Sequence, residues 1–495
     1  MRVSHRTLNA VAGSVWLLVG TGLATVGVRF VFGWNETDSQ RTALGIGIAL
    51  ALGCLAGAAK GRYVLARTAR RNKRRIAKLN APRVWQVFTG RFVIVILLMI
   101  ALGRGLRALA ADGWLGGRLG VGGLYVGIGM ALAVAARAYF IKPPPPMPTR
   151  LDAAPGKASA RPPEPMPTRL DAAPGKSSAV RGVLLVNLGS PAAPTPRAVR
   201  AFLRQFLGDP RVVEVNRLLW AFVLNVMILP FRSGTSAALY RSIWTEEGSP
   251  LIVVCRRLQR ALARRLGDQR PVALGMRYGE PSLGAALDEL DARGCDEILV
   301  VSLFPQESNT TTGSVVAEVN RLAAASRKPP AIAYLPSYCD DPAFIDALAA
   351  RADAYPAGDF TVFSFHGIPE SYVRQGDPYL EQCGRTAWAL AQRLGLPRDE
   401  WEMVFQSRFG DEPWLQPYLD EYVPGLATSH PRVRVIAPSF TADCLETLEE
   451  ITLRLGEDFA RAGGSELIVV PCLNDDAAWV EALAAFVERS CGRGG

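Results

Sequence analysis

The chain contains three histidines, and one of them, His366, stands where an imidazole can do chemistry. It ends the apolar run 360–365 and is followed by the turn residues Gly367 and Pro369. A neutral imidazole accepts protons near neutral pH and is a common metal ligand. A histidine at a strand end can instead cap a neighbouring carbonyl group. The position and the turn make His366 a candidate catalytic and metal-binding residue.

Three carboxylates lie in a later segment, 442–455, whose pattern predicts a helix. Asp443, Glu446 and Glu450 occupy positions i, i+3 and i+7, which an α-helix places on one face. Carboxylates in a first helical turn also complement the helix dipole, which accounts well for Asp443, in part for Glu446 and poorly for Glu450. The alternative is a row that conducts a divalent cation or protons, so all three are candidate metal ligands.

Other polar residues follow predicted strands. Arg277 and Tyr278 come after the run 272–275, where a guanidinium and an aromatic ring would hold a planar acidic ligand. The pair is also compatible with an ordinary surface position. Ser190 and Gln306 stand in the polar segments after two more strands and are candidate substrate contacts. Neither a Walker lysine nor a GxGxxG motif is present, so nucleotide binding is not favoured.

The elements that must position these residues alternate between short β-rich runs and longer amphipathic stretches. Strands are predicted at 182–188, 272–275, 297–303, 332–335, 360–365, 402–405, 433–437 and 466–470. This alternation predicts an α/β fold, with parallel sheets covered by helices and ligands bound beyond the carboxyl ends of the strands. The strands divide into two sets of four around a joint at 340–356, which predicts two doubly wound lobes.

Residues 1–142 have the composition of an all-α membrane domain. Four apolar segments predict transmembrane helices, at 8–28, 43–59, 92–103 and 119–135. The third is shorter than the ~20 residues that span a bilayer, although flanking arginines can reach the interface. The loop 61–91 holds ten Lys and Arg and no acid, which marks it as cytoplasmic. With four crossings the main domain is cytoplasmic too, and without the third crossing it lies outside.

Charge separates the chain into parts. Residues 1–181 carry 26 Lys and Arg against 6 Asp and Glu, whereas residues 182–495 carry 30 against 39. The larger part is acidic, which argues against nucleic acid as its partner. PMPTRLDAAPGK occurs at 146–157 and again at 165–176, and this Pro- and Ala-rich repeat predicts a linker over 143–181. The eight cysteines form no CxxC pair, so no disulfide framework, zinc site or iron–sulfur cluster is expected.

The stretch 216–231, NRLLWAFVLNVMILPF, is strongly apolar and contains Pro230. One interpretation is a buried core helix. The other is an exposed apolar lip, which would suit a greasy substrate or the bilayer surface. Both interpretations stay open at the level of sequence.

Six motifs together resemble the ferrochelatase family, whose enzymes insert ferrous iron into a porphyrin at the end of haem synthesis. They are GVLLVNLGSP (182–191), QFLGDPRVV (205–213), GMRYGEPS (275–282), FSFHGIP (363–369), FQSRFGDEPWLQPY (405–418) and FTADCLETLEEI (440–451). The likeness covers residues 182–490 and is nearest to the proteobacterial branch. It implies two Rossmann-like lobes, at 182–340 and 341–495, in agreement with the strand count.

The resemblance also implies roles for single residues. His366 is similar to the family's active-site histidine, and Glu446 to its acidic partner across the cleft. Positions that resemble the lining of the porphyrin pocket are Arg277, Tyr278 and Trp414. The implied substrates are protoporphyrin IX and Fe²⁺, with protohaem as product and no tightly bound cofactor. The implied location is the bacterial inner membrane, as a multi-pass protein whose catalytic domain faces the cytoplasm, with lipid and an upstream oxidase of the haem pathway as candidate partners.

The sequence departs from the family pattern at several positions. Glu307 stands where many members have an aromatic residue, and Asn309 where many have cysteine. Arg454 replaces a carboxylate that extends the acidic row beyond Glu450 in some members. The sequence therefore does not define the route by which iron would enter. Two rival functions also stay open: a chelatase for another tetrapyrrole or metal, such as coproporphyrin or cobalt, and a membrane-tethered porphyrin or haem carrier without turnover.

Overall fold

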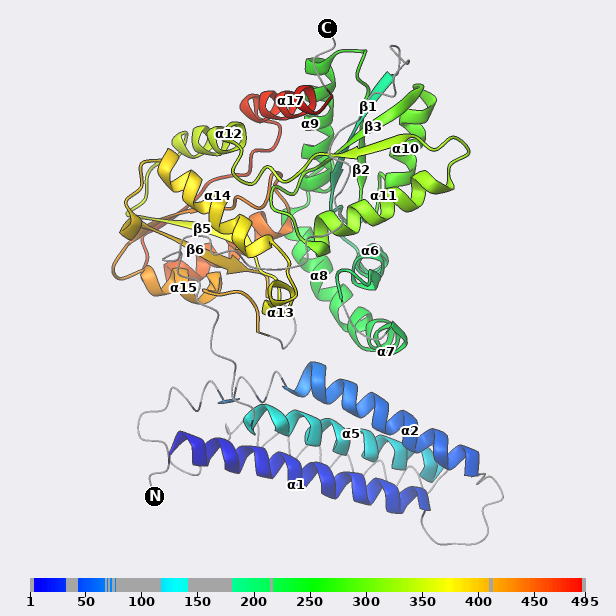
Figure 1. Ribbon diagram of the computed structural model, residues 1–495. Helices are drawn as coiled ribbons and strands as arrows, with labels where there is room; N and C mark the ends of the chain where they lie inside the picture. Colours follow the sequence, from blue (N-terminus) through cyan, green and yellow to red (C-terminus); the bar gives the residue numbers. More distant parts are fainter. Residues whose placement is uncertain are drawn as a thin grey trace. The chain divides into compact units, whose positions relative to one another are not determined.

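The structure is a computed structural model of the 495-residue chain. It describes residues 4–32, 43–66, 69, 72, 73, 76, 117–140, 180–213, 217–408 and 413–491. The chain divides into two compact units, residues 1–145 with 409–413 and residues 146–408 with 414–495 (Figure 1). We call them the helical unit and the α/β unit. The predicted linker 143–181, except for its last two residues, lies outside the described residues.

The helical unit contains helices that approach each other through glycines. Its described elements are α1 (His5–Phe32), α2 (Ala43–Lys60), the π-helical turn η1 (Gly61–Leu65) and α5 (Gly117–Phe140). A Cβ on Gly27 of α1 would lie 2.7 Å from the carbonyl oxygen of Gly122 in α5. A Cβ on Gly57 of α2 would clash with the carbonyl oxygen of Gly127. Small residues thus let α5 pack closely against both α1 and α2, as is common in membrane helix bundles.

Two helices among the described residues are long and apolar enough to cross a membrane, Thr7–Arg29 and Val121–Phe140. The prediction of four such helices is wrong for this part of the chain. The segment predicted at 43–59 does form a helix, but its apolar stretch, Ile46–Lys60, is shorter than a bilayer requires. The predicted helix at 92–103 lies outside the described residues.

The first sheet of the α/β unit is parallel, with strand order β2-β1-β3-β4. Its strands are β1 (Val180–Asn187), β2 (Val272–Met276), β3 (Cys295–Ser302) and β4 (Ala331–Tyr334). Leu185 of β1 is in register with Leu274 of β2 and Val301 of β3. These strands are apolar along nearly their whole length because helices cover both faces of the sheet.

The second sheet repeats this plan, with strand order β6-β5-β7-β8 and parallel pairing throughout. Its strands are β5 (Phe360–His366), β6 (Trp401–Gln406), β7 (Arg432–Ile436) and β8 (Glu466–Val469). All eight predicted strands are confirmed, four in each sheet. The predicted two-lobed α/β architecture is therefore confirmed as well.

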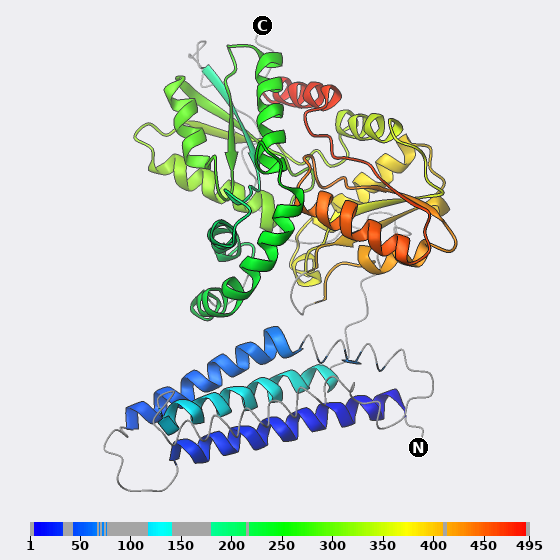
Figure 2. The same cartoon turned by 180° about the vertical axis from the view of Figure 1, so that it is seen from behind.

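Helices flank both sheets (Figures 1 and 2). Those up to the end of the first sheet are α6 (Pro196–Gly208), α7 (Arg217–Phe222), η4 (Val223–Ile228), α8 (Leu229–Ile243), α9 (Pro250–Leu266), α10 (Leu283–Ala292), η5 (Asn309–Gly313) and α11 (Ser314–Ala325). The later ones are α12 (Pro342–Asp353), α13 (Glu370–Arg374), α14 (Tyr379–Arg393), η6 (Arg398–Glu400), α15 (Leu419–Leu426), η7 (Glu446–Leu455), α16 (Gly456–Arg461) and α17 (Ala477–Cys491).

The two lobes share one hydrophobic core. Val183 and Leu185 of β1 belong to the same buried cluster as Phe363 and Phe365 of β5 and Trp479 of α17. Helix α17 packs against α9 as well as against α12, so the end of the chain returns to the first lobe (Figure 2). A shared core of this kind holds the carboxyl ends of the two sheets in a fixed relation.

Candidate active site

His366 ends strand β5, at the carboxyl edge of the second sheet. Its backbone N–H donates to the hydroxyl oxygen of Ser439 over 3.2 Å, and its ring Nδ1 lies 2.7 Å from the carbonyl oxygen of Gly367. A carbonyl oxygen can only accept a hydrogen bond, so Nδ1 carries the proton of the neutral ring. Nε2 is then the nitrogen with a lone pair, which can accept a proton or bind a metal ion.

The His366 side chain and helix η7 lie on the same face of the second sheet. Alternate residues of a strand share a face. Val362 of β5 packs in one cluster with Ile451 of η7, and His366 follows Val362 by four positions. Glu446 is the first residue of η7. Helix η7 covers the sheet that ends in His366, so His366 and Glu446 both belong to the second lobe, and the expectation that Glu446 faces His366 stays a prediction.

Gln406 connects the strand end of His366 to the helix of Glu446. It ends β6, in register with His366, and its carbonyl oxygen accepts the Gly367 N–H over 2.8 Å. Its side-chain Nε2 donates to the carbonyl oxygen of Glu446 over 3.1 Å, and its Oε1 accepts the Ser364 hydroxyl over 2.7 Å. Gln406 is 3% exposed, so these bonds form away from water, where losing one is costly.

The charge of Glu446 acts on two neighbouring proton donors, Cys444 and Tyr240. Burial raises the pKa of the Cys444 thiol well above its usual range, and the charge of Glu446 raises it further. Burial likewise raises the pKa of Tyr240 in α8, again with a contribution from Glu446. The thiol and the phenol therefore keep their protons at neutral pH, and neither competes with Glu446 as an anion.

Asp443 is separated from the other two carboxylates of the predicted row. The predicted α-helix over 442–455 would place it on the face of Glu446, but the observed helix is a π-helix that begins at Glu446 itself. The Asp443 carboxylate accepts hydrogen bonds from Asn474 Nδ2 (2.7 Å), Thr447 Oγ1 (3.0 Å) and the Cys472 N–H (3.3 Å). These bonds fix the loop after β8 against the start of η7, and they occupy the oxygens that a metal would use.

Glu450 is occupied by a neighbouring turn. Its Oε1 accepts the backbone N–H of Ser407 over 3.0 Å, and its Oε2 accepts the Ser407 hydroxyl. Ser407 has a φ of 61°, in the left-handed region that serine rarely adopts. Among the described residues no group of three or more His, Cys, Asp and Glu side chains is arranged to hold a metal ion. The four predicted metal ligands thus do not converge on one site.

Arg277 and Tyr278 belong to a hydrogen-bonded cluster with Asp209 and Ser314, which we call the knot. Arg277 Nη2 (2.6 Å), Ser314 Oγ (2.6 Å) and Tyr278 Oη (2.9 Å) all donate to Oδ2 of Asp209. The Arg277 guanidinium also lies 4.5 Å from the centroid of the Tyr278 ring. Tyr278 is 2% exposed, so its ring is part of the core. The pair joins the end of β2 to the end of α6 and the start of α11.

The Asp209 carboxyl holds its charge in spite of burial. Burial by itself would raise its pKa, but hydrogen bonds from Ser314, from the Arg211 N–H and from Tyr278, together with the Arg277 charge, lower the pKa below its ordinary value. Burial raises the pKa of Tyr278 well above the usual range of a phenol. Asp209 is therefore ionised and Tyr278 neutral near neutral pH.

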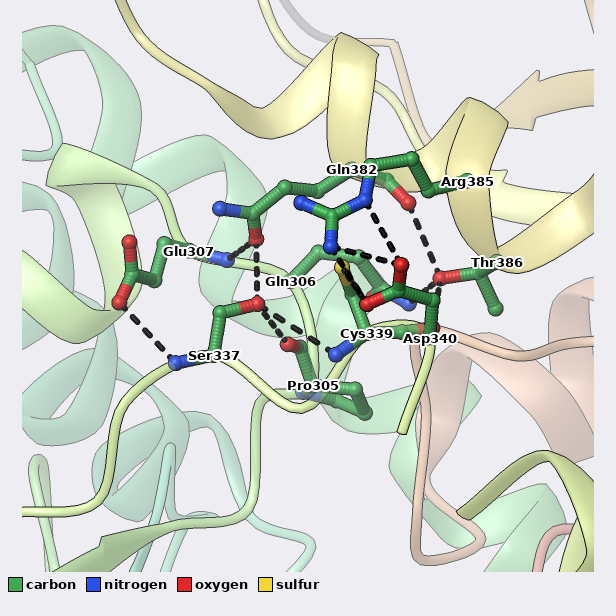
Figure 3. A network of polar contacts seen from close by, with 9 residues as sticks. All are labelled: Pro305, Gln306, Glu307, Ser337, Cys339, Asp340, Gln382, Arg385 and Thr386. Carbon is green, nitrogen blue, oxygen red and sulfur yellow. Dashed lines mark hydrogen bonds and ion pairs between the residues drawn. The ribbon is translucent and has the colours of Figure 1, made fainter. Parts of the chain in front are cut away.

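Ser190 and Gln306, the other predicted substrate contacts, are buried and paired within the protein. The two hydroxyls of Ser190 and Ser249 lie 2.7 Å apart. Gln306 Nε2 donates to Thr386 Oγ1 over 2.9 Å, across the two lobes, and the contact belongs to the network in Figure 3. In that network the Gln382 amide oxygen also accepts the Glu307 N–H and the Ser337 hydroxyl. The structure thus brings Gln306 to the joint between the lobes.

Trp414 lies beside the turn that follows His366. Its backbone pairs with Pro369 in an isolated bridge, and a Cβ on Gly367 would lie 3.2 Å from its ring. The indole Nε1 is buried without a hydrogen-bond partner among the described residues. Trp414, one of the residues predicted to line the substrate site, thus lies beside the turn of His366.

The apolar stretch at 216–231 is exposed in part, as the lip interpretation requires. Among its described side chains, Phe222 is 39%, Val226 53% and Phe231 77% exposed. The two helical halves, Trp220–Val226 and Leu229–Ile243, meet at 58°. A bend and three exposed apolar side chains favour a lip over a fully buried core helix.

The sequence patterns did not single out three residues that organise the site: Asp209, Gln406 and Ser407. Asp209 stands in LGDP, where an aspartate before a proline is typical of a turn. Gln406 and Ser407 were visible only as a polar pair at the end of a strand. The partners of their side chains lie 40 residues or more from them in the chain, which no local pattern reveals.

Comparison with known proteins agrees with this geometry. The ferrochelatase family profile matches residues 180–491. The chain is 50% identical over 307 residues to a ferrochelatase of Klebsiella pneumoniae (strain 342), covering 61% of this chain and 95% of that protein. It is 47% identical over 311 residues to a ferrochelatase of Enterobacter sp. (strain 638), covering 62% and 97%. The chain belongs to the ferrochelatase family.

Among solved structures, the chain is similar to SirB from Bacillus subtilis with Fe3+, at a TM-score of 0.39 and 12% identity, over 63% of this chain and 96% of that one. Family membership carries the activity: as a ferrochelatase, a lyase, the chain inserts ferrous iron into protoporphyrin. The matched residues coincide with the α/β unit from β1 to α17, and the helical unit precedes them.

Proposed function

We propose that His366 and Glu446 are the groups that carry out metal insertion in this ferrochelatase. Three observations support the proposal: His366 keeps its Nε2 lone pair, the two residues share one face of the second sheet, and Gln406 ties them together. Both side chains are half-buried, which leaves them reachable by a substrate.

The reaction exchanges two protons for one metal ion. A free-base porphyrin carries two pyrrole N–H protons and is nearly planar, so Fe²⁺ enters only as the ring puckers and both protons leave. A site that favours the puckered ring binds the transition state better than the substrate. In our proposal Nε2 of His366 accepts one pyrrole proton, and the Glu446 carboxylate accepts the second. The pyrrole nitrogens that lose these protons then bind the Fe²⁺ ion.

The decisive experiment is the substitution His366→Ala in the full-length protein in detergent. Insertion of Fe²⁺ or Zn²⁺ into protoporphyrin is followed by absorbance. We expect kcat to fall by about 100-fold or more, the range of a lost general base. The matched control is His430→Ala, because His430 lies on the far end of the same sheet, with its ring 4.9 Å from Phe360. Unchanged insertion by His366→Ala would refute the proposal.

The same assay separates the rival functions. Coproporphyrin in place of protoporphyrin, and Co²⁺ in place of Fe²⁺, test whether another tetrapyrrole or metal is preferred. A ratio of kcat/KM that favours coproporphyrin or cobalt would move the assignment within the chelatase class. Tight porphyrin binding without insertion of any metal would instead favour a carrier.

We also propose that α1 and α5 anchor the enzyme in the inner membrane with the α/β unit on the cytoplasmic side. The two apolar helices and the basic loop 61–91 support anchoring and orientation. A membrane location suits a reaction whose substrate and product dissolve poorly in water. The loop 61–91 precedes α5 and the α/β unit follows it, so α5 alone would place them on opposite sides of the membrane. A cytoplasmic α/β unit therefore also depends on the crossing predicted at 92–103, which lies outside the described residues.

Fusions at the C-terminus test this orientation. Green fluorescent protein folds in the cytoplasm, and alkaline phosphatase is active outside it. We expect a fluorescent fusion and an inactive phosphatase fusion. An active phosphatase fusion would place the α/β unit outside and overturn the proposed orientation, while leaving the activity untouched.

A further inference from the structure

Gln406 is the one described side chain that is hydrogen-bonded both to the strand of His366 and to the helix of Glu446. We propose that Gln406 is a positioning residue for metal insertion, which sets the placement of Glu446 relative to His366. The inference rests on the proposed roles of those two residues and adds a third residue to them.

The orientation of the Gln406 amide is fixed by chemistry. The carbonyl oxygen of Glu446 can only accept, so the NH₂ group of Gln406 must face it. The amide oxygen then faces the Ser364 hydroxyl, which donates to it over 2.7 Å. Ser364 is fully buried and lies on the face of β5 that also carries His366, two positions on. The amide is thus a rigid bridge with a single satisfied orientation.

The backbone of Gln406 adds a second connection. Its carbonyl oxygen accepts the N–H of Gly367, the residue whose own carbonyl oxygen holds Nδ1 of His366. A shift of β6 would therefore move Gly367, and this would change the tilt of the His366 ring and the hydrogen bond that fixes its tautomer. On the other side, the Gln406 side chain donates to the carbonyl oxygen of Glu446, the first residue of η7.

The residue after Gln406 is restrained as well. Ser407 keeps its left-handed backbone through two hydrogen bonds to Glu450, a second attachment between β6 and η7 one turn further along that helix. Gln406 and Ser407 together hold the start of η7 at two points. These two attachments restrain the position of Glu446 at the start of η7. Such restraint matters for metal insertion, since a displacement of about 1 Å can cost 100-fold in rate.

The test uses the full-length protein and a substitution of similar volume, Gln406→Met, which removes the amide. We expect kcat for metal insertion to fall about tenfold or more, with KM for protoporphyrin changed less than about twofold. Gln392→Met, on the exposed face of α14, is the matched control and leaves kcat unchanged. Gln406→Glu keeps an acceptor for Ser364 but has no donor for Glu446, so it should be as impaired as Gln406→Met.

A double-mutant cycle separates positioning from general damage. If Gln406 acts through Glu446, Gln406→Met in a Glu446→Ala background lowers kcat by less than about twofold. Equal losses in both backgrounds would overturn the proposal, as would an unchanged kcat in the single variant. Rates are expressed per folded molecule, from circular dichroism and the melting temperature.

Two further outcomes keep the result interpretable. If Gln406→Met does not fold, Ser364→Ala takes its place in the double-mutant cycle with Glu446→Ala. Ser364→Ala removes only one of the hydrogen bonds of the Gln406 amide, so we expect a smaller loss of kcat, about threefold. If His366→Ala and Glu446→Ala both retain full activity, the proposed function itself fails. If they lose activity while Gln406→Met and Ser364→Ala do not, only the positioning role fails.

Discussion

The carboxylate of Glu450 holds Ser407 in a left-handed backbone conformation, accepting both its N–H and its hydroxyl. A left-handed conformation costs a residue with a Cβ on the order of 1–2 kcal/mol, so the two bonds to Glu450 are what make it affordable in a serine. Because Ser407 directly follows Gln406, this contact fixes the strand end next to His366. Glu450 thus has a structural partner that the sequence pattern of a metal-conducting row did not include.

The contact predicts an unusual order of stability at position 407. Ser407→Gly loses the hydroxyl bond but relieves the strained backbone, whereas Ser407→Ala loses the bond and keeps the strain. The glycine variant should therefore be more stable than the alanine variant by about 1 kcal/mol, and it should melt at the higher temperature. The melting temperatures of the purified variants check this. An alanine variant that melts above the glycine variant would contradict the described conformation.

A second prediction concerns the role of Glu450 itself. Glu450→Gln keeps an oxygen that accepts the Ser407 N–H but removes the charge that would attract Fe²⁺. If the main role of Glu450 is to hold Ser407, Glu450→Gln changes KM for Fe²⁺ by less than about twofold, while Glu450→Ala lowers the melting temperature. Initial rates measured against Fe²⁺ concentration decide between this structural role and a role in binding the metal. A large rise in KM for Fe²⁺ with Glu450→Gln would restore Glu450 to the metal path.

The knot around Asp209 predicts a loss of stability in acid. The pKa of Asp209 in the folded protein lies below its unfolded value of about 3.9. A lowered folded-state pKa contributes stability that is fully present above the unfolded pKa and is lost as the pH falls through the folded one. Asp209→Asn should therefore destabilise the α/β unit at pH 7, on the order of 3 kcal/mol, because it leaves the Arg277 charge partly buried and unpaired.

The pH dependence of the difference provides the check. Melting temperatures of wild type and Asp209→Asn are compared between pH 7 and pH 3. The gap between the two proteins should narrow as the pH falls below about 4, because protonation then removes the same charge from the wild type. A gap that stays constant down to pH 3 would show that the carboxylate charge of Asp209 has no part in holding the knot.

The strands and the place of His366 at the end of one of them were predictable from sequence, and the reason is local. A parallel strand covered on both faces needs an apolar run, and the residue that ends such a run lies at the ligand-binding edge. His366 satisfied both conditions. The hydrogen bonds around this strand end were not predictable, because the Ser364–Gln406 and Ser407–Glu450 bonds join residues 42 and 43 positions apart.

The acidic row shows why a helical pattern can mislead. Asp443, Glu446 and Glu450 have α-helical spacing, yet the helix begins only at Glu446 and has π-helical hydrogen bonds. Asp443 precedes it and is committed to Asn474. Periodicity reports which residues would share a face of a regular helix, but it does not report where a helix begins or which carboxylates already have partners.

The joint between the lobes predicts that Gln382 stabilises their relative placement (Figure 3). Its amide oxygen accepts the N–H of Glu307 over 2.7 Å and the hydroxyl of Ser337 over 2.7 Å, and it is largely buried. Gln382→Ala leaves both donors without this partner, which should cost about 1–3 kcal/mol. The melting temperature should fall, and Gln392→Ala, on the exposed side of the same helix, is the control. Equal melting temperatures would show that the joint does not depend on this amide.

The helical unit permits a matched pair of glycine substitutions in α2. A Cβ on Gly57 would clash with the carbonyl oxygen of Gly127 in α5, whereas a Cβ on Gly47 meets nothing within 4 Å. Gly57→Val should separate α2 from α5, because main-chain atoms cannot move aside, and Gly47→Val should not. Hydrogen–deuterium exchange of the full-length protein in detergent measures the separation as faster exchange in α2 and α5. Both substitutions add the same side chain to the same apolar helix. Faster exchange in both variants would therefore mean that the helix propensity of valine, and not the glycine contact with α5, decides whether α2 packs.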